Sequence, residues 1–301
     1  MRRFKSFLLA ALFAVCTFGF AACRINPSTG SGSGSNTDPN ESDFVAVEGA
    51  GFNPDEKYKL NELDFKNKDY LDASKNDEVL GIFKDNAQAV QDKTAGTLSG
   101  AVQNAVGDNA TFAITLNYES YTGTVIEFTT TVNEGTLDLS FHSQEGVWDR
   151  NTYNCKLRVV SDTHQITKFG KYKSVFELMS PWKVIDLRNK KITYRLAIKN
   201  AEAWLYVVDF DGAERQPMRK QETPPGQDEQ WVYTNINNVK LADQSQGLPI
   251  PTDVPYSKMA RDIDNPFTSG YLAITWYAPA RNSDITLHSY KIYTPYSAVN
   301  Q

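Results

Sequence analysis

Two adjacent aromatic residues beside a short polar loop form the feature of this sequence best suited to binding chemistry. In AITWYAPARNSD, Trp276 and Tyr277 are neighbours in an alternating segment, and Arg281 and Asn282 follow them. Indole and phenol rings stack on flat apolar faces such as those of pyranose sugars, while polar side chains hold hydroxyl groups. Successive side chains of a strand point to opposite faces, so one ring must leave the core unless both faces are buried. These four residues are our candidate ligand-binding site.

The remaining indoles are expected mainly in the core. Large aromatic residues in alternating strands usually face the opposite sheet, which applies to Trp182, Trp204 and Trp231. Trp204 and Tyr206 share one face of the segment EAWLYVVD. We interpret Trp204 as a core residue, with a ligand platform as the alternative.

Signatures of catalysis are weak. None of His142, His164 and His288 has a metal-ligating partner two or four residues after it. The sequence contains no GxSxG, no P-loop and no GxGxxG motif. Paired carboxylates among the 36 acidic residues leave a glycoside hydrolase open as an alternative. We expect a protein that is not an enzyme and assign no catalytic residue.

The N-terminus has the pattern of a secretory signal. Three cationic residues, Arg2, Arg3 and Lys5, precede an uncharged apolar segment over residues 7–20. Small residues follow where a peptidase must bind an extended chain, and the apolar run is short for a membrane span. Residues 1–22 are therefore predicted to be a signal peptide, with a transmembrane anchor as the alternative.

The tetrapeptide FAAC at residues 20–23 resembles the lipobox of bacterial lipoproteins, in which the cysteine becomes acylated. Phe20 departs from the usual Leu, but the two small residues and Cys23 are present. The resemblance implies lipidation at Cys23 and a lipid anchor in the bacterial cell envelope, where we expect the outer membrane. Residues 24–43 are rich in Ser, Gly, Asn and Pro and are too poor in apolar side chains to fold. Residues 23–43 thus read as the lipidated cysteine and a disordered tether reaching about 20–25 Å.

Charge and cysteine content restrict the partners and the chemistry. The formal net charge is −5, and it becomes more negative without the basic signal segment. This balance argues against nucleic acid and against adhesion to anionic lipid by charge. Cys155 is the one cysteine left after Cys16 leaves with the signal and Cys23 takes a lipid. The mature chain then has no intramolecular disulfide, and we interpret Cys155 as structural, with a reactive thiol as the alternative.

Most of the chain alternates with a period of two, which predicts antiparallel strands. The predicted strands are 111–118, 125–132, 136–141, 171–179, 190–198, 203–212, 230–236, 270–278 and 283–293. One or two short helices are expected before them. In residues 76–91, the apolar residues Leu80, Phe83, Ala87 and Val90 have helical spacing, and Asn76 could cap the N-terminus of the helix. Residues 99–107 are a weaker candidate for a second helix. The fold class is mainly β, an antiparallel β-sandwich of the jelly-roll type.

A change of composition in GVWDRNTYN suggests a boundary near residues 150–156. We predict a β-rich N-terminal region over residues 44–155, with a helical segment near 76–106, and a jelly-roll domain over residues 156–301. A single β-domain covering both regions is the alternative.

The order of segments in the C-terminal region resembles the galactose-binding-like jelly rolls found in many carbohydrate-binding modules. The segments are KYKSVFELM, IDLRNKKITYRLAI, AWLYVVDFDGAE, DEQWVYTNI and SDITLHSYKIY. The resemblance implies a polysaccharide partner and no cofactor. His288 and Ser289 stand where that family often has acidic residues, which argues against its structural calcium. Asp209, Asp211 and Gly212 read as a hairpin turn, because an EF-hand loop needs about a dozen residues.

Two non-catalytic hypotheses follow. The first is an anchored lipoprotein that binds glycan, and the second is a structural or protein-binding envelope lipoprotein. Exposed aromatic side chains suit both, since protein interfaces also favour Tyr, Trp and Arg.

Overall fold

A computed structural model provides the structure of the chain. It describes residues 41–100, 109–144, 151–161, 164–171, 174–175, 177–178, 190–210, 218–221, 230–233, 255, 257–259, 261–262, 266–279 and 284–299. The signal segment, Cys23, most of the tether, Trp182, Asp211, Gly212, Arg281 and Asn282 lie outside these residues.

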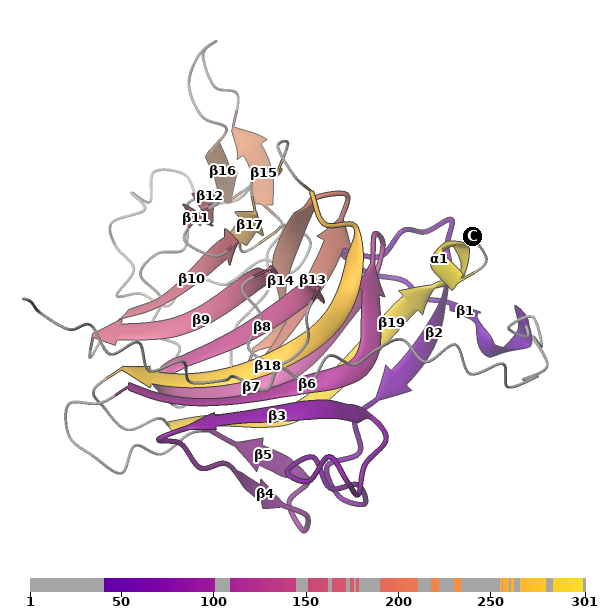
Figure 1. Cartoon of the computed structure of the whole chain (residues 1–301). Coiled ribbons are helices and arrows are strands. Elements are labelled where there is room, and N and C mark those ends of the chain that lie inside the picture. Colours follow the sequence, from indigo (N-terminus) through magenta and orange to yellow (C-terminus); the bar gives the residue numbers. More distant parts are fainter. Residues whose placement is uncertain are drawn as a thin grey trace, which may run out of the picture. The chain divides into compact units, whose positions relative to one another are not determined.

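Strands make up most of the described chain (Figure 1). Their bounds are β1 Val45–Ala46, β2 Lys57–Glu62, β3 Val79–Asp85, β4 Val90–Asp92, β5 Thr97–Ser99, β6 Asn109–Tyr121, β7 Val125–Glu134, β8 Thr136–Ser143, β9 Tyr153–Ser161, β10 His164–Lys171, β11 Ser174–Val175, β12 Glu177–Leu178, β13 Ile192–Lys199, β14 Glu202–Phe210, β15 Met218–Gln221, β16 Gln230–Tyr233, β17 Ser257–Met259, β18 Ser269–Pro279 and β19 Asp284–Pro295. The helices are a 3-10 turn η1, Glu41–Asp43, and α1, Tyr296–Val299. No described helix has the length and apolar content needed to cross a bilayer.

Two large sheets form the fold. Sheet I has ten strands, in the order β1-β2-β19-β7-β13-β14-β17-β12 with β5 and β4 branching from β19. Sheet II has seven described strands, in the order β11-β10-β9-β8-β18-β6-β3, and β15 pairs with β16 in a separate two-stranded sheet. Every pairing between described strands is antiparallel. The mainly β, antiparallel β-sandwich predicted from the sequence is confirmed.

The main core combines apolar side chains from the two sheets. Phe112 of β6 and Trp276 of β18, on sheet II, have ring centroids 5.9 Å apart. Phe128 of β7 and Tyr194 of β13, on sheet I, stack at 5.3 Å in the same cluster. Cys155 of β9 is also fully buried there, which agrees with a structural thiol.

A second, smaller cluster covers the other face of sheet I. It consists of Phe52, Tyr58, Val125, Ala197 and Tyr206. The segment before β2 is fastened there by Arg195, which donates to the Ala50 carbonyl at 2.8 Å and pairs with Glu127 at 2.7 Å. Sheet I is therefore packed on both faces in this region, whereas the main core lies on one face of sheet II.

The helix predicted over residues 76–91 is wrong. Its central part is β3, which pairs with β6, and Val90 begins β4. Leu80 and Val90 are 41% and 59% exposed, so the residues with helical spacing do not share a buried face. Asn76 closes a turn, because its side chain accepts from the Glu78 N–H. Pairing with a neighbouring strand has overridden the local spacing. Of the second candidate helix, Ser99 ends β5 and residues 101–108 lie outside the described residues.

The proposed boundary near residues 150–156 does not separate two sheets. In sheet II, β9 lies between β8 and β10, and β18 lies between β8 and β6. In sheet I, β19 pairs with β2 and β7. Each sheet therefore contains paired strands from both predicted regions. Residues 41–43, expected at the end of the tether, form η1 instead.

Candidate functional site

The face of sheet II that points away from the core is set by the alternation of its strands. In β6, Phe112, Ile114 and Leu116 belong to the core cluster, so Thr111, Ala113 and Thr115 point the other way. The same alternation applies to β18, β8 and β9, which follow β6 in the sheet and lie side by side with it as long arrows in Figure 1. The polar face, as we name it, comprises Thr111, Ala113, Thr115, Ala273, Thr275, Tyr277, Thr136, Asp138, Ser140, Asn154 and Lys156.

Strand register arranges this polar face in rows across β6, β18, β8 and β9. One row runs Thr115, Ala273, Ser140, Asn154, and the next runs Ala113, Thr275, Asp138, Lys156. Neighbouring strands are about 4.8 Å apart, and residues two apart on a strand are about 7 Å apart. Each row therefore extends about 14 Å, and hydrogen-bonding side chains from segments distant in sequence come together.

Three oxygen atoms of these rows are buried without a hydrogen-bond partner in the described part of the chain: Thr115 Oγ1, Asp138 Oδ1 and Asn154 Oδ1. An unpartnered buried polar group costs about 1–3 kcal/mol of stability, and native proteins contain few of them. Three on one face of the same sheet therefore need an explanation, and a polar ligand that bonds to them would supply it.

Asp138 and Lys156 add an ion pair to the polar face. Lys156 Nζ lies 3.5 Å from Asp138 Oδ2, which leaves Oδ1 without a partner. Burial raises the pKa of Asp138 to about 6, although Lys156 opposes the increase. Desolvation thus exceeds the stabilisation that the ammonium group gives to the carboxylate.

The structure separates the two aromatic residues predicted to form the site. Trp276 is 0% exposed and packs in the main core, so it cannot serve as a stacking platform. Tyr277 is half-buried on the polar face, paired across the strands with Thr111 and Thr136. Its contact with a ligand stays a prediction. Arg281 and Asn282 lie outside the described residues.

No protein-family model matches the chain, and no curated protein matches it. Solved structures similar to it include the carbohydrate-binding module CBM66 from Bacillus subtilis, at 14% identity and a TM-score of 0.37, over 72% of this chain and 93% of that one. Another is a protein of unknown function with a galectin-like fold from Bacillus subtilis. It has 12% identity and a TM-score of 0.43, over 79% of this chain and 98% of that one. A third is the metal-free exoplasmic/lumenal domain of VIP36. It has 7% identity and a TM-score of 0.42, over 78% of this chain and 93% of that one. With TM-scores this low, these similarities carry no argument about what this chain binds.

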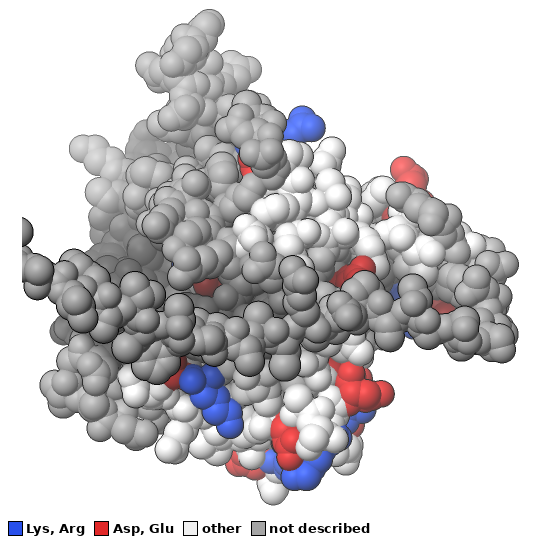
Figure 2. Space-filling view, viewed as in Figure 1, with Lys and Arg blue, Asp and Glu red and all other residues white. Residues whose placement is uncertain are grey.

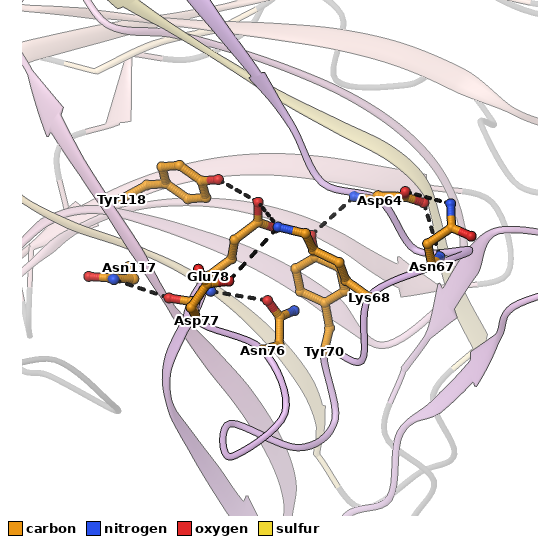
Figure 3. A network of polar contacts seen from close by, with 9 residues as sticks. All are labelled: Asp64, Asn67, Lys68, Tyr70, Asn76, Asp77, Glu78, Asn117 and Tyr118. Carbon is orange, nitrogen blue, oxygen red and sulfur yellow. Dashed lines mark hydrogen bonds and ion pairs between the residues drawn. The ribbon is translucent and has the colours of Figure 1, made fainter.

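A second polar network surrounds Glu78 just before β3 (Figure 3). Its carboxylate accepts from Lys68 Nζ at 2.7 Å, from Tyr118 Oη at 2.7 Å and from the Tyr70 hydroxyl. Burial alone would raise the pKa of Glu78, but these three hydrogen bonds outweigh it and lower the pKa. Glu78 is therefore an ionised acceptor that holds the loop after β2 against β6. We assign this network a structural role, because its donors already use the carboxylate.

Ser120 and His142 form the closest approach to a nucleophile–base pair among the described residues. Ser120 Oγ lies 2.9 Å from His142 Nδ1. However, both residues are 0% exposed, and Ser120 Oγ already donates to the Gly270 carbonyl and accepts from the His142 N–H. Burial lowers the pKa of His142 to about 4. These hydrogen bonds hold β6, β8 and β18 together. The backbone of His142 has a positive φ of 54° at this point.

The described residues contain no group of three or more His, Cys, Asp or Glu side chains arranged to hold a metal ion. His288 instead hydrogen-bonds to Thr131 at 3.0 Å across sheet I. Charged side chains of both signs are interspersed on the described surface visible in Figure 2. Bulk charge therefore offers no basis for recognition on that surface, and individual hydrogen bonds on the polar face are the better candidates.

Thr115, Asp138 and Asn154 were not identified from the sequence. A weak signal existed for Asp138, which alternates with apolar residues in TLDLSF and so had to face away from the core. The three residues share one face because β6, β18, β8 and β9 pair in that order, which no local pattern predicts.

Proposed function

We propose that this protein binds a neutral glycan, without catalysis, through the polar face of sheet II. The observation that carries the proposal is the set of three unpartnered oxygens, Thr115 Oγ1, Asp138 Oδ1 and Asn154 Oδ1. The Asp138 and Asn154 atoms are acceptors only, and the threonine hydroxyl can accept as well. A complementary ligand must present several hydrogen-bond donors, which a hydroxyl-rich sugar does.

The same face supplies a surface for the apolar side of a sugar ring. Tyr277 lies two residues along β18 from Thr275, and Thr275 pairs with Asp138. Its partly exposed phenol ring can contact a pyranose while the neighbouring oxygens bind hydroxyl groups. A uronic acid suits the face less well, since its carboxylate would meet that of Asp138.

The three unpartnered atoms are closed to solvent in this structure. The partly exposed side chains of Asn154, Lys156 and Tyr277 therefore make the first contacts with the ligand. The ligand reaches the three buried oxygens only when the side chains of the polar face rearrange to expose them. This rearrangement costs free energy, and part of the binding free energy must offset that cost, so the net affinity is lower. Weak binding is the result, with a long polysaccharide gaining from repeated attachment.

We further propose that Cys23 carries a lipid that attaches the chain to the bacterial outer membrane. The support comes from the sequence: a basic start, an apolar segment and FAAC directly before a Ser/Gly-rich tract. An anchored binding protein would hold polysaccharide close to the cell surface.

Affinity electrophoresis of the full chain in detergent tests the binding function. Gels containing neutral polysaccharides of different linkage should retard the wild-type protein in at least one case, and Tyr277→Ala should abolish the retardation without unfolding the protein. If no neutral polysaccharide retards the wild-type chain, the glycan proposal is wrong, and the protein-binding alternative would be favoured.

A further inference from the structure

Trp204 occupies a different surface, on the outer face of sheet I. Its neighbours in β14, Ala203 and Leu205, are buried in the main core, so the indole points away from that core. Trp204 is only partly buried and packs against the edge of the second cluster. The sequence favoured a core position for this residue, but the structure places it at a border between apolar packing and solvent.

Two ammonium groups lie close to this indole. Lys258 Nζ is 4.8 Å and Lys199 Nζ is 5.3 Å from the ring centroid. They come from strands on opposite sides of β14, because Trp204 pairs with Lys258 of β17 and with Ala197 of β13, two residues before Lys199. Sheet pairing therefore fixes both cations beside one aromatic ring.

The segment before β2 packs on sheet I beside two neighbours of Trp204, namely Ala197 and Tyr206. A Cβ at Gly51 would lie 3.1 Å from Ala197 Cβ and 3.1 Å from the ring of Tyr206, so the segment contacts sheet I closely there. Ala197 and Tyr206 are thus covered, while Trp204, Lys199 and Lys258 stay partly exposed. A ligand could contact these three side chains together.

The charges around Trp204 favour an anion. Lys199 lies over the indole, and its cross-strand partner Glu202 is an acidic neighbour within electrostatic reach. Burial lowers the pKa of Lys199, while Glu202 opposes this shift. The two ammonium groups stand beside one ring, and a single carboxylate could accept hydrogen bonds from both.

We propose that Trp204, Lys199 and Lys258 form a second binding site, which takes an acidic sugar. The C–H face of the sugar contacts the indole, and its carboxylate binds both ammonium groups. This site lies on the sheet opposite the polar face and has the opposite charge preference. It therefore goes beyond the neutral-glycan proposal and does not depend on it.

The test compares two charge-neutralised variants of the full chain in detergent. Lys199→Gln with Lys258→Gln removes the proposed site, and Lys59→Gln with Lys191→Gln removes two exposed lysines elsewhere. Titration with polygalacturonate should show affinity weakened about tenfold or more in the first variant only. Wild-type binding should also weaken as salt is added. Sodium acetate at equal carboxylate concentration should not compete, since it lacks a ring for the indole.

Several outcomes would overturn this site. They are absence of polygalacturonate binding by the wild-type chain, equal losses in both variants, and full competition by acetate. Trp204→Phe, which keeps an aromatic ring, provides a second check and should weaken binding less than the double lysine change. If the lysines only cover the indole with their aliphatic stems, the double change will lower the melting temperature and leave affinity unaltered. Retardation by neutral polysaccharide should persist in all these variants, which separates this proposal from the first.

Discussion

Asp138 of β8 and Lys156 of β9 face each other across a backbone pair, with Oδ2 and Nζ 3.5 Å apart. The second oxygen of this carboxylate is buried with no partner among the described residues. The ion pair thus satisfies one oxygen of the carboxylate and leaves the other without a hydrogen bond from any described residue. The cost of this arrangement to the free protein can be measured.

Stability should depend on pH through Asp138. Burial raises its folded pKa to about 6 from a usual value of 3.8, so the folded state binds the proton more tightly than the unfolded state. The contribution of Asp138 to the free energy of unfolding is therefore highest below about pH 4 and is lost as the pH rises through about 6. Asp138→Asn should remove this loss and gain about 1–3 kcal/mol relative to wild type between pH 4 and pH 7.

Urea unfolding of wild type and Asp138→Asn at several pH values measures this difference. The comparison is needed because His142, with its pKa lowered to about 4 by burial, acts in the opposite sense over the same range. Its neutral ring stabilises the fold at neutral pH, and that contribution falls as the pH drops through 6.5 towards 4. A constant difference between the two proteins across the range would contradict the raised pKa of Asp138.

Trp276 and Tyr277 should respond differently to replacement by alanine. Trp276 is fully buried in the main core, so Trp276→Ala should cost about 3–5 kcal/mol of unfolding free energy. Tyr277 is partly exposed on the polar face, and Tyr277→Ala should cost clearly less while abolishing retardation by glycan. Denaturant unfolding and affinity electrophoresis on the same preparations give both quantities. Equal destabilisation by the two changes would remove Tyr277 from the proposed site.

The Glu78 network should contribute to stability and not to binding. Glu78→Gln removes the charge that Lys68, Tyr70 and Tyr118 stabilise, and we expect a loss of about 1–3 kcal/mol. Asp77→Asn is the matched control, since the Asp77 side chain is 94% exposed and lies 3.9 Å from the same lysine. It should change the melting temperature little. A loss of glycan retardation in Glu78→Gln at full stability would show that the network belongs to a binding site.

Local alternation predicted the strands well, because side chains of period two fit a sheet with one buried face. The segments around Phe112, Leu137 and Ile274 are in β6, β8 and β18 as expected. Spacing failed at β3, an edge strand whose Leu80 is exposed, where pairing with β6 determined the structure. The polar face could not be predicted, since Thr115 and Asn154 come into one row only through the order of four strands.

Lipidation at Cys23 can be tested independently of the fold. Cells that express the wild-type chain should incorporate a fatty-acid analogue into it, and Cys23→Ser should remove the label, because the thiol is the acylated group. Membrane fractionation of the same cells should show the wild-type protein with the envelope and the variant largely released. Equal labelling of both proteins would rule out the lipoprotein interpretation.

Thr115→Val most directly tests the claim that unpartnered oxygens on the polar face bind glycan. The change keeps the shape of the side chain and removes a buried hydroxyl that has no partner among the described residues. It should therefore raise the free energy of unfolding, by about 1 kcal/mol, while weakening retardation by the neutral polysaccharide. Thr130→Val is the control: its hydroxyl donates to the Thr286 carbonyl at 2.8 Å on sheet I, so its loss should lower stability and leave retardation unchanged. Unfolding and affinity electrophoresis of both variants decide the matter. A more stable Thr115→Val protein that binds glycan less tightly is the predicted result, and unchanged glycan affinity in that variant would contradict the account.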